Sequence, residues 1–431
     1  MNRHYSHPQV SDRPCRELSI AARVVESAGR ALRRLEDSSF QAIIEKPIER
    51  GYFNPSEQEK LRDWFVRFLT ARQALQECVE ELRHEAMFHG HHRAFAVVYP
   101  AACAMVRAAR FLVTTMAVDR VVQRKLNEAV PEYHIPKKSF TNIRRSLTSP
   151  RNAWHLLHAK QFAVEMREEL QLLADDPEIG PAASLIPDVE SAIDVNPREW
   201  LFGRLRYRLH GFRRRNKVAA ERAFFAIAEA SGRLLSCIKR SGLPALNKEM
   251  RLKIVDLLEA GDVVITRHDG VATNLFLPGY WPHASLFVRN GQFLEARKDG
   301  VRLRFPEDTL AVDAVVVLRP RLEQSDIEEG IDRAMQHEGK LYNFDFDFFT
   351  DDRLVCTEVV YRGYQGLGKI EFELSQRAGR PSLSAEDILN LALQDRYFDV
   401  VMMLSGQYTG GRLLQGKEAI KRLRDSVVTV R

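Results

Sequence analysis

The chain is poor in cysteine, and its cysteines are not spaced to act together. The 431 residues include five, at Cys15, Cys78, Cys103, Cys237 and Cys356, without any Cys-x-x-Cys pair. An odd number of scattered thiols argues against a disulfide framework and is typical of a reducing compartment. The length predicts two or more domains, and the hydrophobic content of 45% is sufficient for packed cores.

The sequence also lacks long apolar runs without charge. Its start, MNRHYSHPQVSDRPC, has no apolar segment of the kind found in signal peptides, so we expect a cytoplasmic protein without lipidation at Cys15. The most apolar stretch, residues 94–117, is interrupted by Arg107 and Arg110. Because a membrane span needs about 20 apolar residues with few charges, we expect a buried bundle helix here instead.

Metal motifs, internal repeats and low-complexity tracts are missing as well. Histidines gather at His84, His89, His91 and His92, but the run His-Glu-Ala-Met-Phe-His misses the His-Glu-x-x-His zinc spacing by one residue. A solvated, histidine-rich helix end explains the cluster better than a metal site. We therefore expect neither a metal nor an organic cofactor.

Charge is present in quantity but divided unevenly. Residues 246–431 hold 25 Lys and Arg against 29 Asp and Glu, a net charge of −4. The remaining 39 basic and 29 acidic residues give residues 1–245 a net charge of +10. The basic half should therefore meet an anionic partner, either a membrane surface or a nucleic acid.

One segment of the basic half, REWLFGRLRYRLHGFRRRNK at 198–217, has a basic amphipathic pattern. Such a helix either lies on an anionic membrane or forms part of a bundle with a charged outer face. The segment has no DNA- or RNA-binding motif, so we do not expect nucleic acid. The residues predicted to face a membrane are Arg204, Arg208, Arg213, Arg214 and Arg215.

Hydrophobic periodicity divides the chain into a helical part and a mixed part. Helices are predicted at 17–32, 54–87, 92–128, 150–174 and 198–240, with a proline-rich linker at 175–197. The turn residues Ser241-Gly-Leu-Pro244 predict a boundary between a basic helical domain, 1–245, and a second domain, 246–431. The oligomeric state stays open.

The second domain alternates short β-rich runs with helical ones, which predicts an α+β fold. Strands are predicted at 263–266, 284–288, 293–296, 312–318, 370–374 and 400–404. Helices are predicted at 325–337, 354–365, 385–393 and 417–424.

This domain also contains a thiol, an imidazole and a carboxylate, the three parts of a cysteine-nucleophile site. Cys356 falls near the start of a predicted helix, where backbone N–H groups and the helix dipole favour a thiolate. It could equally be a buried core thiol. His283 and Glu295 lie on the two strands of a predicted hairpin, and His268 and His337 are alternative bases.

Three motifs around these residues resemble the permuted papain-like hydrolases, the YiiX/YebB-type branch of the NlpC-type peptidase superfamily. They are GDVVITR, WPHASLFVRNGQFLEA and GKLYNFDF…LVCTEVVYRGY, and they span about residues 250–400. As in that branch, the histidine strand precedes the cysteine. The resemblance implies a permuted papain-like domain with Cys356 as nucleophile, His283 as base and Glu295 at the third polar position.

The resemblance extends to the stretch before the cysteine, where Tyr342 and Asp345 match a Tyr-x-x-Asp-like pattern. These two residues either line the pocket, supply an oxyanion donor or serve packing. The implied reaction is acyl transfer, in which Cys356 attacks a carbonyl and an acyl-enzyme is resolved by water or another nucleophile.

The resemblance leaves two substrate classes. Relatives cut amide bonds of peptidoglycan peptides, and permuted relatives similar to lecithin:retinol acyltransferases act on lipid acyl groups. Without an export signal and with a basic first half, we expect a lipid or lipid-linked acyl substrate at the inner membrane face, ahead of a peptidoglycan amidase. The non-enzymatic alternative is a membrane- or nucleic-acid-binding module carrying an inactive hydrolase fold.

The turn of the predicted hairpin decides whether His283 and Glu295 meet. A two-residue turn at Asn290-Gly291 would place them on opposite faces. A three-residue loop, residues 289–291, places them on one face as diagonal neighbours, with Cβ atoms about 7 Å apart. We therefore predict the three-residue loop with Gly291 at positive φ. The other hairpin face, which is apolar throughout, should be the one that faces the core.

Overall fold

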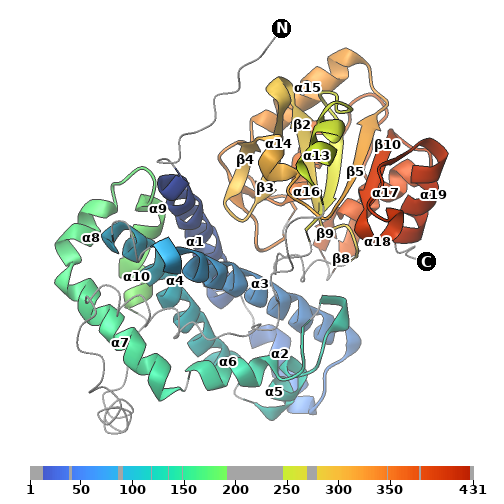
Figure 1. Cartoon of the computed structure of the whole chain (residues 1–431). Helices are drawn as coiled ribbons and strands as arrows, with labels where there is room; N and C mark the ends of the chain where they lie inside the picture. The colour runs from blue at the N-terminus through green and yellow to red at the C-terminus, as the bar shows by residue number, and fades with distance from the viewer. Residues whose placement is uncertain are drawn as a thin grey trace. The chain divides into compact units, whose positions relative to one another are not determined.

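The computed structural model describes residues 13–37, 41–85, 91–117, 119–133, 135–147, 149–191, 246–268, 279–346, 348–377 and 380–427. The chain divides into two compact units, residues 1–128 with 136–234 and residues 129–135 with 235–431 (Figure 1). The predicted helix at 198–240 and the basic segment at 198–217, with Arg204, Arg208, Arg213, Arg214 and Arg215, lie outside the described residues.

The first unit is a helical bundle built around three long helices, α1 (Arg13–Asp37), α3 (Pro55–Glu85) and α4 (His91–Phe111). Along α1 the buried residues recur at three- and four-residue steps, as at Ala21, Val25, Ala28 and Leu32, and form one apolar stripe. The shorter helices are α2 (Gln41–Arg50), α5 (Arg120–Leu126), α6 (Ser139–Leu147), α7 (Pro150–Glu165), α8 (Arg167–Leu173), α9 (Gly180–Ala183) and α10 (Ile186–Glu190).

Several helices of this unit are shorter than predicted. The expected helix at 92–128 is α4, a π-helical turn (Leu112–Met116) and α5, which starts anew because Asp119 accepts the Val121 N–H at 2.6 Å. The expected helix at 150–174 breaks at Met166 into α7 and α8. The expected linker contains α9 and α10, since prolines occupy first-turn positions there and start helices.

The apolar stretch around α4 is long and apolar enough to cross a membrane, by length and composition alone, over residues 92–116. However, 78% of its most apolar window is buried within the protein. Arg107 of this stretch is also buried and donates hydrogen bonds to Glu36 (2.8 Å) and Asp188 (2.9 Å). The stretch is therefore the central helix of the bundle, as its interrupting arginines indicate.

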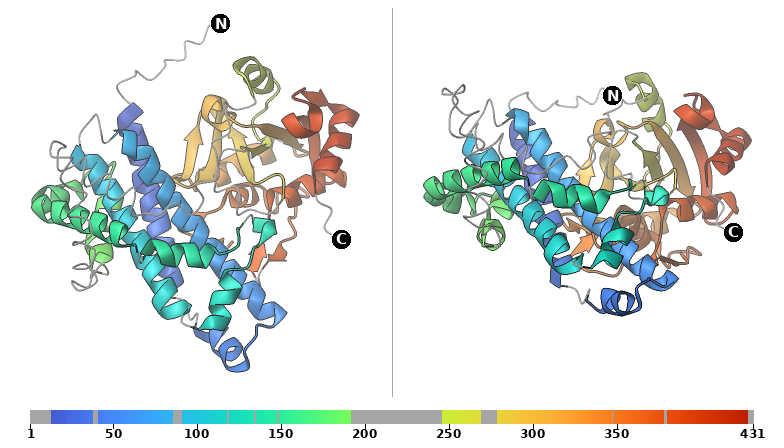
Figure 2. Two further views of the ribbon diagram at one scale, coloured as in Figure 1. Left: turned by 60° about the horizontal axis from the view of Figure 1, so that its bottom comes forward. Right: turned by 90° about the horizontal axis from the view of Figure 1, so that it is seen from below.

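The second unit is built on an antiparallel seven-stranded sheet, and it has the predicted α+β class. In sheet order the strands are β11 (Leu414–Gln415), β10 (Phe398–Ser405), β5 (Ala314–Pro320), β1 (Val263–Arg267), β2 (His283–Val288), β3 (Gln292–Arg297) and β4 (Gly300–Arg304). In both views of Figure 2 these strands appear in yellow to red.

Helices and two small ladders complete this unit. The helices are α13 (Lys248–Val255), α14 (Pro306–Thr309), α15 (Gln324–Met335), α16 (Cys356–Tyr364), α17 (Ala385–Leu393), α18 (Gly406–Thr409) and α19 (Gly416–Ser426). The ladders pair β6 (Leu341–Tyr342) with β7 (Arg353–Leu354) and β8 (Ser375–Arg377) with β9 (Arg380–Ser382). The strand predicted at 370–374 does not form, because the chain pairs in the β8–β9 hairpin just after it.

Both faces of the β2–β3 hairpin are buried. The face with Leu286 and Leu294 is apolar as predicted, and α16 packs against β2 and β3. The opposite face carries His283, but Phe287 and Phe293 on it also join a core cluster with Ile254 of α13. The expectation of a single core-facing side was wrong because α13, which the sequence reading did not identify, contributes to that second core.

The loop of this hairpin has the predicted form. Val288 lies opposite Gln292, so the connection is the three residues Arg289–Gly291. Gly291 has φ 72°, and Asn290 also takes a positive φ of 64°, a conformation that Asn tolerates better than most residues. The register therefore puts residues 283 and 295 on one face of the sheet.

Candidate active site

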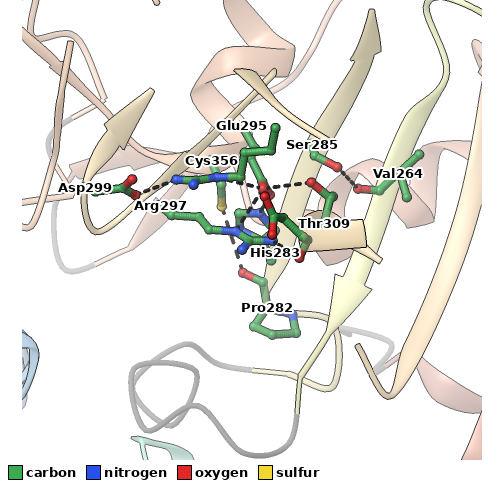
Figure 3. Close-up of polar contacts among 11 residues, drawn as sticks. Val264, Pro282, His283, Ser285, Glu295, Arg297, Asp299, Thr309 and Cys356 are labelled. Atoms are coloured by element: carbon green, nitrogen blue, oxygen red, sulfur yellow. Dashed lines mark hydrogen bonds and ion pairs between the residues drawn. The ribbon is translucent and has the colours of Figure 1, made fainter. Parts of the chain in front are cut away.

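Adjacent strands bring His283 and Glu295 together. The Nε2 atom of His283, the first residue of β2, lies 2.6 Å from Oε2 of Glu295 on β3 (Figure 3). The Glu295 side chain is fully buried, whereas that of His283 is 17% exposed. The imidazole is therefore anchored from the interior on one ring nitrogen and keeps the other, Nδ1, for a partner on its far side.

Positive groups surround the carboxylate of Glu295. Its Oε1 accepts a hydrogen bond from the Thr309 hydroxyl (3.0 Å) and forms ion pairs with Arg297 (2.9 Å) and Arg304 (3.1 Å). Burial alone would raise the pKa of Glu295, but Arg297, the His283 hydrogen bond and Arg304 hold it well below its ordinary range. Glu295 is therefore a carboxylate anion throughout the physiological pH range.

The sequence reading missed the groups that support Glu295. Arg304 lies on β4, an edge strand that was not predicted, and Thr309 lies at the end of the short helix α14. The run Gly-Val-Arg-Leu-Arg at 300–304 has the period of two that indicates a strand, and it would have placed Arg304 on one face with Arg302. Thr309 gives no comparable signal, because its approach depends on how α14 packs.

Cys356 is the first residue of α16, at the end of the helix where the backbone N–H groups point outward. It is 5% exposed, and its Sγ lies 4.0 Å from the carbonyl oxygen of Pro282, the residue before His283 (Figure 3). The helix start is fixed by Glu358, whose carboxylate accepts the Val355 N–H (3.4 Å). Glu358 is thus part of the helix N-terminus.

The thiol and the imidazole shift each other's ionisation. Burial alone would lower the pKa of His283, but the Cys356 and Glu295 partners raise it to about 9. Burial alone would raise the pKa of Cys356, but the charge and hydrogen bond of His283, with the N–H groups of Ala284 and Thr357, lower it below its ordinary value. The arrangement therefore favours a thiolate paired with an imidazolium ion.

The two residues predicted from the stretch before the cysteine differ in position. Tyr342, on β6, is 9% exposed, and burial together with the charge of Cys356 raises the pKa of its phenol, which keeps the proton next to the sulfur. Asp345 forms an ion pair with Arg353 (3.6 Å), and its N–H bonds to the Asn343 side chain (3.1 Å). Tyr342 is thus a buried, protonated phenol near the thiol, while Asp345 lies in an ion pair of the loop between β6 and β7.

The two alternative bases, His268 and His337, have other surroundings. His268, just after β1, bonds through Nδ1 to Asp313 (3.0 Å). His337 follows α15, and burial together with Lys340 and Arg362 lowers its pKa to about 4, so it is neutral. The imidazole that lowers the pKa of Cys356 is that of His283.

Among the residues that the structure describes, no group of three or more His, Cys, Asp or Glu side chains is placed to hold a metal ion. His92, from the predicted histidine-rich helix end, pairs with Glu169 of α8.

Comparison with known proteins identifies the domain around this site. Residues 257–389 match the model of a family described as permuted papain-like amidase enzymes, YaeF/YiiX, C92 family. No curated protein and no solved structure matches the chain. The match spans the His283 hairpin and Cys356 and confirms the resemblance drawn from the three motifs; the helical first unit lies outside it.

Proposed function

We propose that this permuted papain-like amidase domain is an active cysteine hydrolase, with Cys356 as nucleophile, His283 as acid and base, and Glu295 as the carboxylate that orients the imidazole. The observation that carries the proposal is the continuous contact from Glu295 through His283 to a Cys356 thiol of lowered pKa. These are the roles that a cysteine acyl-transfer mechanism requires.

The steps follow from the atoms in place. The Cys356 thiolate attacks the substrate carbonyl carbon, and the N–H of Cys356 with the Tyr342 hydroxyl donates to the developing oxyanion. The His283 imidazolium then gives its proton to the leaving group, which departs and leaves a thioester. His283, now neutral, takes a proton from water, the hydroxide attacks the thioester, and the carboxylic acid and the thiolate are released.

The substrate that fits best is an amide, because the matched family is described as an amidase. A lipid or lipid-linked acyl group is the second candidate, favoured by the net charge of +10 over residues 1–245. That basic half would hold the protein at the anionic inner face of a membrane, through the arginines at 204, 208 and 213–215.

The test of the reaction is direct. Wild-type protein and a Cys356→Ala variant are incubated with peptidoglycan peptides and with lipid extracts, and the products are identified by mass spectrometry. A product that needs Cys356, together with an acyl adduct on the tryptic peptide containing it, supports the proposal. Equal hydrolysis by the variant would contradict it.

The proposed binding to an anionic membrane needs a separate measurement. Flotation with liposomes should rise with phosphatidylglycerol content, fall with salt and drop when Arg213, Arg214 and Arg215 are replaced by Ala. If the protein cleaves peptide amides but does not float with anionic liposomes, the hypothesis of a lipid substrate is wrong and the hypothesis of an amide substrate is retained.

A further inference from the structure

We propose that Glu386 is a positioning residue of this site, which holds the segment that delivers His283 to Cys356; the inference rests on the proposed function. Glu386 lies in the first turn of α17, far along the chain from the hairpin, and is 8% exposed. One oxygen of its carboxylate accepts the backbone N–H of Tyr280 (2.6 Å) and that of Trp281 (3.4 Å). A buried carboxylate thus binds the two residues that precede Pro282 and His283.

The segment that Glu386 binds enters the site directly. It ends at Pro282, whose carbonyl oxygen is the one 4.0 Å from the Cys356 sulfur, and then continues as His283 of β2. It begins at Gly279, which has φ +92°, and a Cβ there would lie 2.3 Å from Oε1 of Glu386. The backbone at residue 279 therefore lies against the Glu386 carboxylate and leaves no room there for a side chain. This close approach restricts the path of the segment.

Other groups hold the side chains and carbonyl of the same segment. Arg267 donates to the Tyr280 carbonyl (2.8 Å) and stacks over its ring at 4.6 Å, and the Tyr280 hydroxyl bonds to Ser405 (2.8 Å). The Trp281 indole N–H donates to Ser426 (2.9 Å). Glu386 completes this set, because it binds the N–H groups of the backbone two and three residues before His283.

The Glu386 carboxylate affects the reaction because the His283 imidazole must lie next to the Cys356 sulfur, whose own position is fixed. Without an acceptor for two buried N–H groups, the segment 279–282 is expected to shift and carry the start of β2 with it. A displacement of about 1 Å at a reacting group costs on the order of 10²-fold in rate. The pKa of Cys356 should respond as well, since His283 supplies the positive charge that lowers it.

The experiment is the rate of Cys356 alkylation by iodoacetamide as a function of pH in the full chain, which requires no substrate. Wild type should react with a midpoint well below the pH of about 8.5 that an ordinary thiol shows. Glu386→Ala should move the midpoint upward and slow the reaction at pH 6 about tenfold. Glu386→Gln keeps an oxygen acceptor for both N–H groups and should stay within about twofold of wild type.

Asp387, the next residue, offers a matched control. It caps α17 by accepting the Ser384 N–H at 2.7 Å, whereas the N–H groups of Tyr280 and Trp281 donate to Glu386. Asp387→Ala should lower the melting temperature yet leave the alkylation profile unchanged. A Glu386→Ala protein that melts earlier but keeps the wild-type profile would show a purely structural role and overturn the inference.

Two further outcomes are decisive. If Glu386→Ala does not fold, Gly279→Ala takes its place, since the added Cβ pushes directly on the carboxylate; an unchanged profile in that variant overturns the inference. An ordinary thiol profile in the wild type instead overturns the proposed function itself, and this inference with it.

Discussion

The two units each bury a cysteine among polar groups, and the pKa values of the two thiols move in opposite directions. Cys103 lies inside α4, completely buried beside Tyr99, and burial raises its pKa far above the ordinary value. Cys356 is nearly as buried, but its pKa is lowered. Burial alone therefore does not decide whether a thiol is reactive.

The difference lies in what each sulfur meets. At Cys103 burial raises the thiol pKa more than the Tyr99 hydrogen bond and the Lys160 charge lower it, and Glu190, which accepts the Tyr99 hydroxyl at 2.9 Å, raises it further. Next to Cys356 stands an imidazole whose positive charge Glu295 stabilises, and the sulfur sits at a helix N-terminus. In the helical unit the buried polar groups thus connect helices. In the sheet unit they favour the ionised form of the Cys356 side chain.

The sharpest test of this contrast removes each thiol in turn. Cys356→Ala should reduce hydrolysis by roughly 10³-fold or more, because the nucleophile is lost. Cys103→Ala should leave kcat/KM within about twofold of wild type, since a neutral buried thiol acts only in packing. Turnover of the substrate found by mass spectrometry measures both. Similar losses in the two variants would contradict the assignment.

Removing the imidazole should make Cys356 behave more like Cys103. In His283→Ala, the charge that lowers the thiol pKa is gone while burial remains. Alkylation of Cys356 at pH 6 should then slow by about 30-fold, because a smaller fraction of the thiol is ionised. In wild type, Cys103 should stay unmodified under the same conditions because burial raises the pKa of its thiol. Labelling of Cys356 that does not depend on His283 would refute the pairing.

The pH dependence of kcat/KM should show the same pair. Activity requires the thiolate with the imidazolium, so it is lost when pH falls below the pKa of Cys356 and when it rises through that of His283, about 9. The alkaline limb should therefore lie near pH 9, above the 6.5 of an ordinary imidazole. An alkaline limb near pH 6.5 would show that Cys356 and Glu295 do not hold the proton on His283.

A change in the helical unit should alter stability but not thiol chemistry. Arg107→Ala removes a buried guanidinium and its hydrogen bonds to the half-buried Glu36 and to Asp188, and about 2 kcal/mol of unfolding free energy should be lost. Denaturant unfolding followed by circular dichroism measures this loss. The alkylation profile of Cys356 should match wild type, and a shifted profile would show that the units are coupled.

The smallest expected effect concerns the hairpin loop. Gly291→Ala places a side chain at φ 72° and should cost about 1 kcal/mol of unfolding free energy. Arg289→Ala in the same loop removes an exposed ion pair with Asp332 and a hydrogen bond to the Glu328 carbonyl, and the unfolding free energy should stay close to that of wild type. If the two variants are equally stable, the loop does not impose the strain that its geometry implies.

What could be predicted from the sequence was local. The hairpin register followed from three turn residues and from the chemical need for His283 and Glu295 to share a face, and the structure has that register. The helix with Cys356 at its start followed from residue pattern and family resemblance. Such features depend on neighbours within about a dozen positions, which a sequence pattern records.

What could not be predicted depends on distant packing. Arg304 reaches Glu295 only because β4 pairs with β3, and Glu386 reaches Tyr280 across 106 positions of sequence. The burial of both hairpin faces likewise needed α13, which precedes the sheet in sequence. No periodicity specifies which helix end will meet which loop.

The hydrogen bond between Trp281 and Ser426 can form only late during synthesis of the chain. The two residues are 145 positions apart, so the ribosome makes the histidine strand first, the cysteine helix next and this hydrogen-bonding partner last. A nascent chain that has already produced His283, Glu295 and Cys356 still lacks Ser405 and Ser426, which hold the segment before the histidine. The hydrogen bonds that hold the segment before His283 can therefore form only when nearly the whole domain has been translated.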